Sequence, residues 1–326
     1  MARVKDVAKI AKVSPSTVSR FVRSPEVVTE AKRKRIEAAI AQVGYVRNLN
    51  ASSLKSNSSN LVGIILPAEQ NLFFSSLVNR LNKTLFPEKK LIVFYAEDFN
   101  EVKNNVSTLL SLRVSAILFI PEKKSNTIST LTLSNNCYPL QLFVDNFPTF
   151  DSILIDDRNG AYLAAKKLME CGHKKTLLID GDNDVFQLRK YGYRTAIEEF
   201  GEIFDERSVL SLKSMENCEA IMSERIKEYK PTAVICVTEL LAQRLCFVFQ
   251  KENISIPDDI SLIVYDDSAW AELCGYTAVS QPLETVVENI NALIKMNSGN
   301  YALPSSPIKI KLQPFLTERR SIKNLN

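Results

Sequence analysis

Residues 4–22, VKDVAKIAKVSPSTVSRFV, contain two short helical patterns separated by a tight turn. One apolar stripe at helical spacing runs through the first pattern: Val4, Val7, Ala8 and Ala11. Ser14 then offers a side-chain oxygen to cap a second helix, and Pro15 occupies the first position of that helix. This arrangement predicts a helix-turn-helix.

The second helix has two different sides. Val18, Phe21 and Val22 turn inward. The outward side carries short hydrogen-bond donors and one guanidinium: Ser16, Thr17, Ser19 and Arg20. Such a face can contact the edges of DNA bases. It would also suit a solvent-exposed helix of an ordinary bundle, so the face alone does not decide the function.

The positive charge of the chain is concentrated at its N-terminal end. The 326 residues have a net charge of +4, but residues 1–60 hold 12 Lys or Arg against 4 Asp or Glu, a net charge of +8, and the remainder has −4. A chain of this length can form two or three domains, each with its own core. The asymmetry predicts that a polyanion binds at the N-terminal module. A solvated basic face without a partner is the plainer alternative.

A third helix is expected to complete the basic module. Thr29 is placed to cap it, the helix runs to about Val43, and Gly44 ends it. Its buried stripe consists of Ile36, Ala39, Ile40 and Val43, and Tyr45 is expected to cover the small core. Residues 48–60 are rich in Ser and Asn, which predicts a linker that does not order by itself.

From residue 61 the pattern changes to short apolar runs that alternate with amphipathic helices. The runs are apolar on both faces and cover 61–66, 91–95, 116–120, 140–144, 176–179, 233–237 and 260–264. They are typical of parallel strands covered by helices, such as those expected at 160–171 and 285–296. A second β-α series begins near residue 157. We therefore expect a doubly wound α/β body of two lobes with a cleft between them.

Signatures of several other protein classes are missing from the sequence. None of the nine glycines lies two residues from another, which excludes dinucleotide-binding and P-loop motifs. His173 is the only histidine, and the six cysteines show no C-x-x-C pair and are expected to be buried free thiols. No signal segment opens the chain and no apolar run is long enough to span a bilayer. We therefore expect a cytoplasmic protein that makes no membrane contact and has no catalytic residues, metal site or cofactor.

These features together resemble the lactose-repressor (LacI/GalR) family of bacterial transcription regulators, over essentially the whole chain. The matching residues of the module and linker are Val4-Lys5-Asp6-Val7-Ala8, Val13-Ser14, Thr17-Val18-Ser19-Arg20, Asn48, Ala51 and Leu54. Those of the body are Gly172-His173, Arg189, Gly192-Tyr193, Pro231-Thr232-Ala233, residues 256–261, Tyr265-Asp266-Asp267, Gln281-Pro282 and Glu318-Arg319-Arg320.

The resemblance implies three parts: a helix-turn-helix DNA-binding domain at residues 1–47, a hinge at 48–60, and an effector-binding and dimerisation domain at 61–326. Within the last, the N-lobe takes about 61–157 and 285–313, and the C-lobe takes about 158–284 and 314–326. Each lobe is expected to have the doubly wound fold of a periplasmic binding protein.

The resemblance further implies a homodimer or tetramer that binds double-stranded operator DNA and represses a carbohydrate-utilisation operon. In that family the hinge forms a helix on DNA and paired leucines open the central base step of the minor groove, a position that Leu54 occupies here. Arg20 would suit a guanine. The residues implied to contact DNA are Pro15, Ser16, Thr17, Ser19, Arg20, Thr29, Tyr45, Asn48, Ala51, Leu54 and Lys55.

A small sugar or sugar acid is expected in the cleft, because the two lobes resemble periplasmic sugar-binding proteins. The residues implied to bind it are Phe73, Phe74, Asp145, Asn146, Arg189, Glu239, Asp266 and Trp270. Arg189 and Asp266 are expected to contact opposite ends of a polyhydroxylated, anionic ligand, or else to pair with each other across the cleft.

The chain departs from the family pattern at three places. Lys12 stands in the turn where the family often has Gly, and Ser52 replaces a common Arg of the hinge. Thr238-Glu239 replaces the usual Asn-Asp, which disfavours a plain hexose. Two other functions stay open: a DNA-binding regulator controlled by a protein corepressor, and an enzyme with a DNA-binding domain, which the missing nucleotide motifs and the single histidine disfavour.

Overall fold

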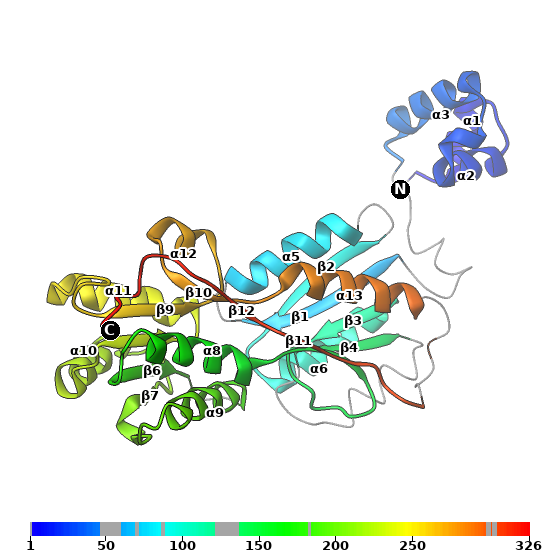
Figure 1. The fold of residues 1–326 in the computed structure, drawn as a ribbon. Coiled ribbons are helices and arrows are strands. Elements are labelled where there is room, and N and C mark those ends of the chain that lie inside the picture. Colours follow the sequence, from blue (N-terminus) through cyan, green and yellow to red (C-terminus); the bar gives the residue numbers. More distant parts are fainter. Residues whose placement is uncertain are drawn as a thin grey trace. The chain divides into compact units, whose positions relative to one another are not determined.

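The computed structural model describes residues 2–45, 60–68, 72–85, 89–120, 137–181, 184–297, 301 and 305–326. It divides the chain into an N-terminal unit, which ends at Ser59, and a body, which begins at Asn60 (Figure 1). Four of the predicted DNA contacts lie outside the described residues, as does the departure at Ser52: Asn48, Ala51, Leu54 and Lys55.

The described part of the N-terminal unit, residues 2–45, contains three α-helices. They are α1 (Val4–Ala11), α2 (Pro15–Arg23) and α3 (Glu30–Val43), with a 3₁₀ turn η1 (Pro25–Val27) between the last two. Their common core consists of Val7, Ala8, Ala11, Val18, Phe21, Val28, Ile36 and Ala39, with Tyr45 packed against it. The helix-turn-helix is thus confirmed, and Gly44 ends α3 in the left-handed conformation, φ 60°.

The turn between α1 and α2 is stabilised by a cation from the third helix. Lys12 adopts the left-handed conformation, φ 52° and ψ 48°, which costs a residue with a side chain about 1–2 kcal/mol. Arg35 of α3 donates hydrogen bonds to the carbonyl oxygens of Ala11 and Lys12, the latter at 2.9 Å. These bonds satisfy carbonyl groups that the end of α1 leaves without helical partners.

The prediction that the Thr29 side chain caps α3 is wrong. Thr29 stands at the N-cap position, but its hydroxyl makes no capping hydrogen bond. The first turn instead contains Glu30, whose negative charge is favoured by the dipole of the helix. The hydroxyl of Thr29 is exposed at the surface of the unit.

Two sheets form the body, which confirms the doubly wound α/β class. In the first sheet all strands are parallel, in the order β11-β5-β4-β3-β1-β2. They are β1 (Leu61–Pro67), β2 (Lys90–Ala96), β3 (Ala116–Phe119), β4 (Tyr138–Leu142), β5 (Asp151–Ile155) and β11 (Lys309–Leu312). Its helices are α5 (Leu72–Leu85), α6 (Phe99–Ser111) and α13 (Leu283–Met296).

The second sheet has the order β12-β10-β9-β8-β6-β7, and β12 is antiparallel to its neighbour. Its strands are β6 (Thr176–Asp180), β7 (Val209–Ser211), β8 (Ala233–Cys236), β9 (Ser261–Tyr265), β10 (Thr277–Ser280) and β12 (Phe315–Thr317). The helices and the 3₁₀ turn around it are α8 (Asp157–Glu170), α9 (Asp184–Glu199), η2 (Glu206–Ser208), α10 (Cys218–Tyr229), α11 (Glu239–Glu252) and α12 (Ala269–Cys274).

Alternating side chains of the first sheet pack into two different cores. Ile64 and Leu66 of β1 belong to the core that α5 and α13 close, whereas Ile65 belongs to the core that α6 closes. A strand that is buried on both faces needs apolar residues at successive positions. This is why the central strands read as unbroken apolar runs.

The chain passes between the two sheets three times: between β5 and α8, between β10 and α13, and between β11 and β12 (Figure 1). Asp156 joins the first and the third of these crossings. Its Oδ1 accepts a hydrogen bond from the backbone N–H of Asn159 (3.1 Å), and its Oδ2 lies 2.8 Å from Nζ of Lys311. The carboxylate therefore caps α8 and holds β11 beside it.

Helices α8 and α9 approach each other closely at Gly192. A Cβ at this position would lie 1.9 Å from the carbonyl oxygen of Arg158, which is backbone and cannot turn away. We expect Gly192→Ala to destabilise the body by about 1–3 kcal/mol in urea denaturation, because the helices must separate. Helix propensity alone would stabilise the variant by about 1 kcal/mol, so a more stable variant would contradict the packing. Gln187→Ala, at an exposed position of α9, is the control.

Candidate DNA-binding face and effector site

The predicted base-contacting residues lie at the start of α2. Ser14 caps the helix, with its Oγ accepting from the backbone N–H of Thr17 at 3.1 Å. The same Oγ also bonds to Oγ of Ser16 (2.7 Å) and Oγ1 of Thr17 (2.8 Å). Pro15, Ser16, Ser19 and Arg20 are exposed and Thr17 is half-buried.

Burial of Val18 and Phe21 fixes which side of α2 faces outward. Residues 16, 19 and 20 then share the opposite side at helical spacing. Two hydroxyls and one guanidinium are the kinds of donor that contact bases and phosphates in the major groove. The structure therefore agrees with the predicted orientation of this helix.

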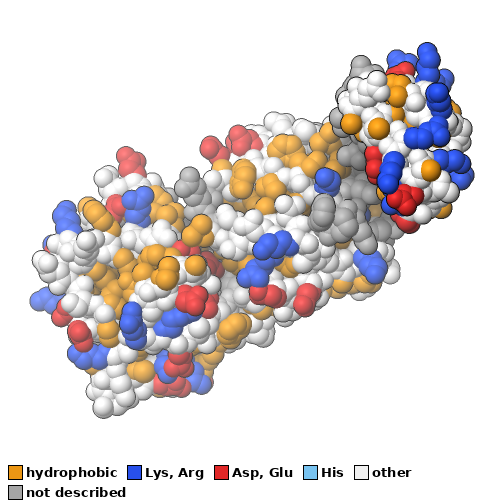
Figure 2. Space-filling model, turned by 90° about the horizontal axis from the view of Figure 1, so that it is seen from above, with side chains coloured by type: hydrophobic (Ala, Val, Ile, Leu, Met, Phe, Trp, Pro, Cys, Tyr) orange, Lys and Arg blue, Asp and Glu red, His pale blue; other side chains and the backbone are white. Residues whose placement is uncertain are grey.

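Lys and Arg side chains gather along one edge of the N-terminal unit (Figure 2). The exposed ones include Lys5, Lys9, Lys12, Arg20 and Lys32. Not every basic residue is available to phosphates, however. Arg33 donates to the carbonyl oxygen of Pro25 at 3.1 Å, and Arg35 holds the turn after α1. Arg33 and Arg35 thus stabilise the fold of the N-terminal unit.

Three of the predicted effector-binding residues come together in the second lobe. Arg189 projects from α9, Glu239 begins α11, and Asp266 follows β9. Each side chain is buried, with 7%, 3% and 7% of the residue exposed. Glu239 and Asp266 follow the carboxyl ends of the parallel strands β8 and β9, the edge where α/β folds bind ligands.

The guanidinium of Arg189 is held by groups of its own lobe. Its Nε and Nη2 lie 2.7 Å and 2.6 Å from Oδ1 of Asp157, the first residue of α8. Its Nη1 donates to the carbonyl oxygen of Val237, and the guanidinium lies 4.2 Å from the ring centre of Tyr265. Although burial disfavours its charged form, the neighbouring Asp157, Tyr265 and Asp266 raise the pKa of Arg189.

The prediction that Arg189 and Asp266 face each other across the cleft is wrong. Both belong to the lobe of the second sheet, and Arg189 forms its ion pair with Asp157. Asp266 instead accepts a hydrogen bond from Nε2 of Gln281. A buried guanidinium must be paired, and the first turn of the adjacent helix α8 supplies the nearest carboxylate.

The two remaining carboxylates of the cluster are perturbed by burial. Burial raises the pKa of Asp266 to about 6, with Glu239 and Asp157 adding to the shift and Arg189 and Gln281 opposing it. Burial also raises the pKa of Glu239, and the nearby Ser268 side chain and the hydrogen bond from Gln243 oppose the rise. Strongly perturbed acids at such an edge favour a ligand site.

The other predicted effector residues lie in different surroundings. Phe73 and Phe74 of α5 pack on Phe143, with ring centres 5.2 Å and 6.3 Å away. Asp145 pairs with Lys309 at 2.6 Å, and Asn146 is half-buried. Trp270 packs edge-on against Tyr276, and both partly buried side chains lie against the core of the second lobe.

Sequence reasoning assigned no role to three residues of these clusters. Asp157, Gln281 and Phe143 each contact a predicted residue that is distant along the chain. The sequence signal for the first two is their position directly at a crossing between the sheets. Phe143 follows β4 in the left-handed conformation, φ 66°, which no pattern in the sequence predicted.

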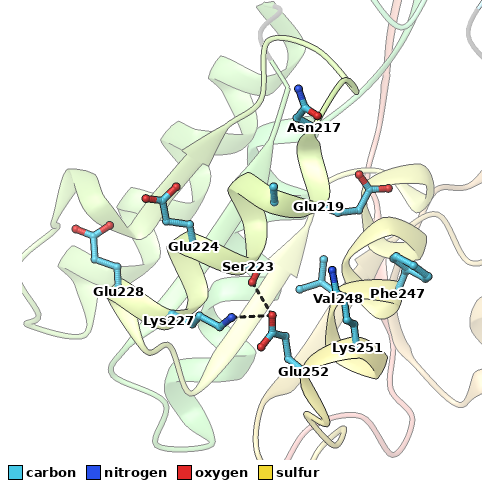
Figure 3. Close-up of a pocket in the computed structure, with 11 residues that line it drawn as sticks. Asn217, Glu219, Ser223, Glu224, Lys227, Glu228, Phe247, Val248, Lys251 and Glu252 are labelled. Carbon is cyan, nitrogen blue, oxygen red and sulfur yellow. Dashed lines mark hydrogen bonds and ion pairs between the residues drawn. The ribbon is translucent and has the colours of Figure 1, made fainter.

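A groove of about 870 Å³ lies between α10 and α11, away from the predicted effector residues (Figure 3). Figure 3 shows Glu252 pointing between these helices, where it pairs with Lys227 (2.7 Å) and Ser223 (2.8 Å). The charged side chains that line the groove are thus partly paired with one another. None of the eight predicted effector residues lines it.

The raised pKa of Asp266 makes the stability of the body depend on pH. Because the folded protein holds this proton more tightly than the unfolded chain, the stabilisation is complete at low pH and is lost as pH rises through about 6. Between pH 4 and pH 7 this effect is expected to lower the free energy of unfolding of the unmodified protein by on the order of 2 kcal/mol. We expect the Asp266→Asn variant to lack this loss, as measured by urea denaturation at each pH. Burial lowers the pKa of His173, so this residue makes stability rise with pH, and it does so in the unmodified protein and in the variant alike. Parallel pH profiles would contradict the prediction.

Comparison with known proteins decides the family. Residues 3–48 match the model described as bacterial regulatory proteins of the lacI family, and residues 59–297 match that of periplasmic binding proteins and the sugar-binding domain of the LacI family. The chain belongs to the LacI family. It is therefore a DNA-binding transcriptional repressor rather than an enzyme.

Individual relatives agree with this assignment over their full length. The HTH-type transcriptional repressor PurR of Vibrio atlanticus is 27% identical over 339 residues, which cover 100% of both chains. The Lac repressor dimer bound to operator and an anti-inducer has the same fold, with a TM-score of 0.79 at 20% identity and 99% of each chain covered. A complex of the regulator CelR with cellobiose has a TM-score of 0.70 at 22% identity, covering 98% of this chain and 100% of the other. Among the described residues, no helix has the length and apolar character needed to cross a membrane.

Proposed function

We propose that this LacI-family chain acts as a homodimer that represses a carbohydrate-utilisation operon under the control of a small sugar. Residues 1–47 bind the operator, residues 48–60 act as a hinge, and residues 61–326 bind the effector and dimerise. The observation that carries the proposal is the exposed side of α2, where a capped helix presents Ser16, Ser19 and Arg20 on a basic unit.

Dimerisation is supported by apolar side chains on the surface of the body. Hydrophobic groups gather on the face shown in Figure 2. The large exposed apolar side chains of the body include Leu273 of α12, which is 83% exposed, and Leu72 of α5, which is 52% exposed. Exposed apolar area of this kind marks an interaction surface. Sedimentation of the protein with a near-palindromic duplex tests the stoichiometry of two chains per duplex.

Leu54 is the proposed wedge of the hinge. The residue lies outside the described part of the chain, so the proposal rests on the sequence and on the family. We expect Leu54→Ala to weaken operator binding and to reduce the bend at the operator centre, because no apolar side chain then separates the base step. Circular permutation of the operator measures the bend. An unchanged bend and affinity would remove the wedge from the proposal.

The cluster of Arg189, Glu239 and Asp266 supports an effector site in the second lobe. Arg189 is bound to Asp157, which directly follows Asp156, the carboxylate that joins two crossings between the sheets. A ligand that changes this cluster therefore acts next to the segments about which the lobes can reorient. Such differential binding to two arrangements is what effector control requires.

The charges of this cluster favour a sugar over a sugar acid. Three carboxylates surround one guanidinium, and that guanidinium is already paired. An anionic ligand would add a further negative charge to the site. Titrating a carbohydrate panel into the protein–operator complex, with fluorescence anisotropy as the readout, tests the proposal. If no sugar changes operator affinity, a protein corepressor becomes the better explanation.

A further inference from the structure

We infer that the effector carries a positively charged amine, as an amino sugar does, and that Glu239 is the residue that selects it. The inference rests on the proposed function, since it names the ligand class of the same site. It depends on how the acceptors and charges around Glu239 are arranged.

Glu239 is a buried carboxylate with an unused acceptor. Only 3% of the residue is exposed. Its Oε1 accepts a hydrogen bond from Nε2 of Gln243 at 2.9 Å. Its Oε2 is buried and receives no hydrogen bond from the described residues, although the Ser268 side chain lies near enough to oppose the rise in the pKa of Glu239. A buried acceptor without a donor is unfavourable, and more so when it is charged. A ligand that donates to Oε2 recovers this energy.

The neighbouring Thr238 does not donate to Oε2 of Glu239. Its Oγ1 accepts from the backbone N–H of Leu241 at 3.3 Å and so caps α11. The pair Thr238-Glu239 stands where the resembled family usually has Asn-Asp, so this chain lacks the amide of that Asn but keeps the acid. The side chains at the start of α11 therefore offer a ligand a carboxylate and a hydroxyl but no amide.

The carboxylates of Glu239 and Asp266 have no ion-pair partner of their own within the described residues, since Arg189 opposes the rise in the pKa of Asp266 but forms its ion pair with Asp157. Glu239 lies close enough to Asp266 to raise the pKa of that carboxyl group, and Arg189 is bound to Asp157 and to the carbonyl oxygen of Val237. Within the described ranges, no hydrogen bond or ion pair joins a Lys or Arg side chain to Glu239 or Asp266. A sugar hydroxyl could donate one hydrogen bond but would leave this charge unbalanced.

An ammonium group satisfies both requirements. It has three donors and one positive charge, so it can bond to Oε2 of Glu239 and to Asp266 together. The hydroxyls of a polyol would then meet the remaining acceptors of the same edge. A carboxylate or phosphate ligand would instead face two unpaired acids.

The test uses ligands that share one sugar skeleton and carry a positive, a neutral or a negative group. For the glucose, galactose and mannose skeletons, the neutral sugar, the 2-amino-2-deoxy sugar, its N-acetyl derivative and the uronic acid are titrated into the full chain at pH 7 by calorimetry. We expect one amino sugar to bind about 10- to 100-fold more tightly than its neutral and N-acetyl counterparts, the ratio typical of a hydrogen bond to a charged group. The acids are expected not to bind.

The variant Glu239→Gln assigns the selectivity to this residue. It should lose that preference for the amino sugar, while the exposed Glu228→Gln should retain it. A neutral sugar or acid that binds as tightly as the amine, and still changes operator affinity, overturns the inference but leaves sugar control intact. If no ligand of any set binds, sugar control itself fails, and the inference fails with it. The comparison of the four ligand forms on the unmodified chain does not depend on the variant.

Discussion

Arg189→Ala is expected to lower the free energy of unfolding of the body by about 3–5 kcal/mol, the usual cost of removing one partner of a buried ion pair. Arg189 and Asp157 are 7% and 5% exposed, and the guanidinium contributes two contacts to one carboxylate oxygen. Truncation leaves that carboxylate and the carbonyl of Val237 without their donor. Urea denaturation of the full chain measures the loss, and a midpoint within experimental error of the unmodified protein would contradict it.

Two further variants separate the ion pair from helix packing. Arg194→Ala removes an exposed pair with Glu198 on the same helix and is expected to cost less than about 1 kcal/mol. Asp157→Asn combined with Arg189→Met should recover part of the stability that Arg189→Ala loses, because no unpaired charge remains. If the double variant is as unstable as the single one, the cost belongs to packing rather than to charge.

Operator affinity is expected to fall about 10³- to 10⁵-fold between about 50 mM and 200 mM salt, as for proteins that contact six to ten phosphates. The exposed cations of the N-terminal unit, among them Lys5, Lys9 and Lys32, are the source of these contacts, and a dimer presents each of them twice. Anisotropy titrations at several salt concentrations give the slope. Lys9→Ala should make the slope shallower, whereas Lys213→Ala, on the exposed surface of the body, should leave it unchanged. A binding constant indifferent to salt would exclude this electrostatic mode.

The N-terminal unit was predictable because its signals are local. The Ser14 cap, Pro15, the apolar stripes and Gly44 all act within one or two turns of the chain, and each is found as expected. Thr29 shows the limit of this reasoning. A residue at an N-cap position can cap a helix, but its rotamer decides whether it does.

Strands of the body were predictable where they are buried on both faces. Each of the seven apolar runs corresponds to a strand within two residues: β1 to β4, β6, β8 and β9. The missed strands lack that pattern. Strand β5 contains Asp151 and Ser152, and β10 begins and ends with the polar residues Thr277 and Ser280. Strand β11 alternates exposed and half-buried residues at an edge, and β7 and β12 have three residues each.

The candidate site was predictable in its residue types but not in its pairing. Residues that follow strands of one sheet gather at one edge, which placed Glu239 and Asp266 together. The partner of Arg189 lies 32 residues earlier, at the start of another helix. The spacing of residues in the sequence does not predict that contact. For the same reason the sequence could not show that Trp270 packs on Tyr276.

The central claim is that α2 recognises a base sequence, and competition binding of full-length protein to a selected operator and to a scrambled duplex tests it most directly. At physiological salt we predict at least about 10³-fold tighter binding to the operator. Arg20→Ala should lower this by roughly 1–3 kcal/mol per half-site and relax the preference at a single base pair. Equal affinity for the two duplexes, or an equal loss on every sequence in the Arg20→Ala variant, would contradict the claim.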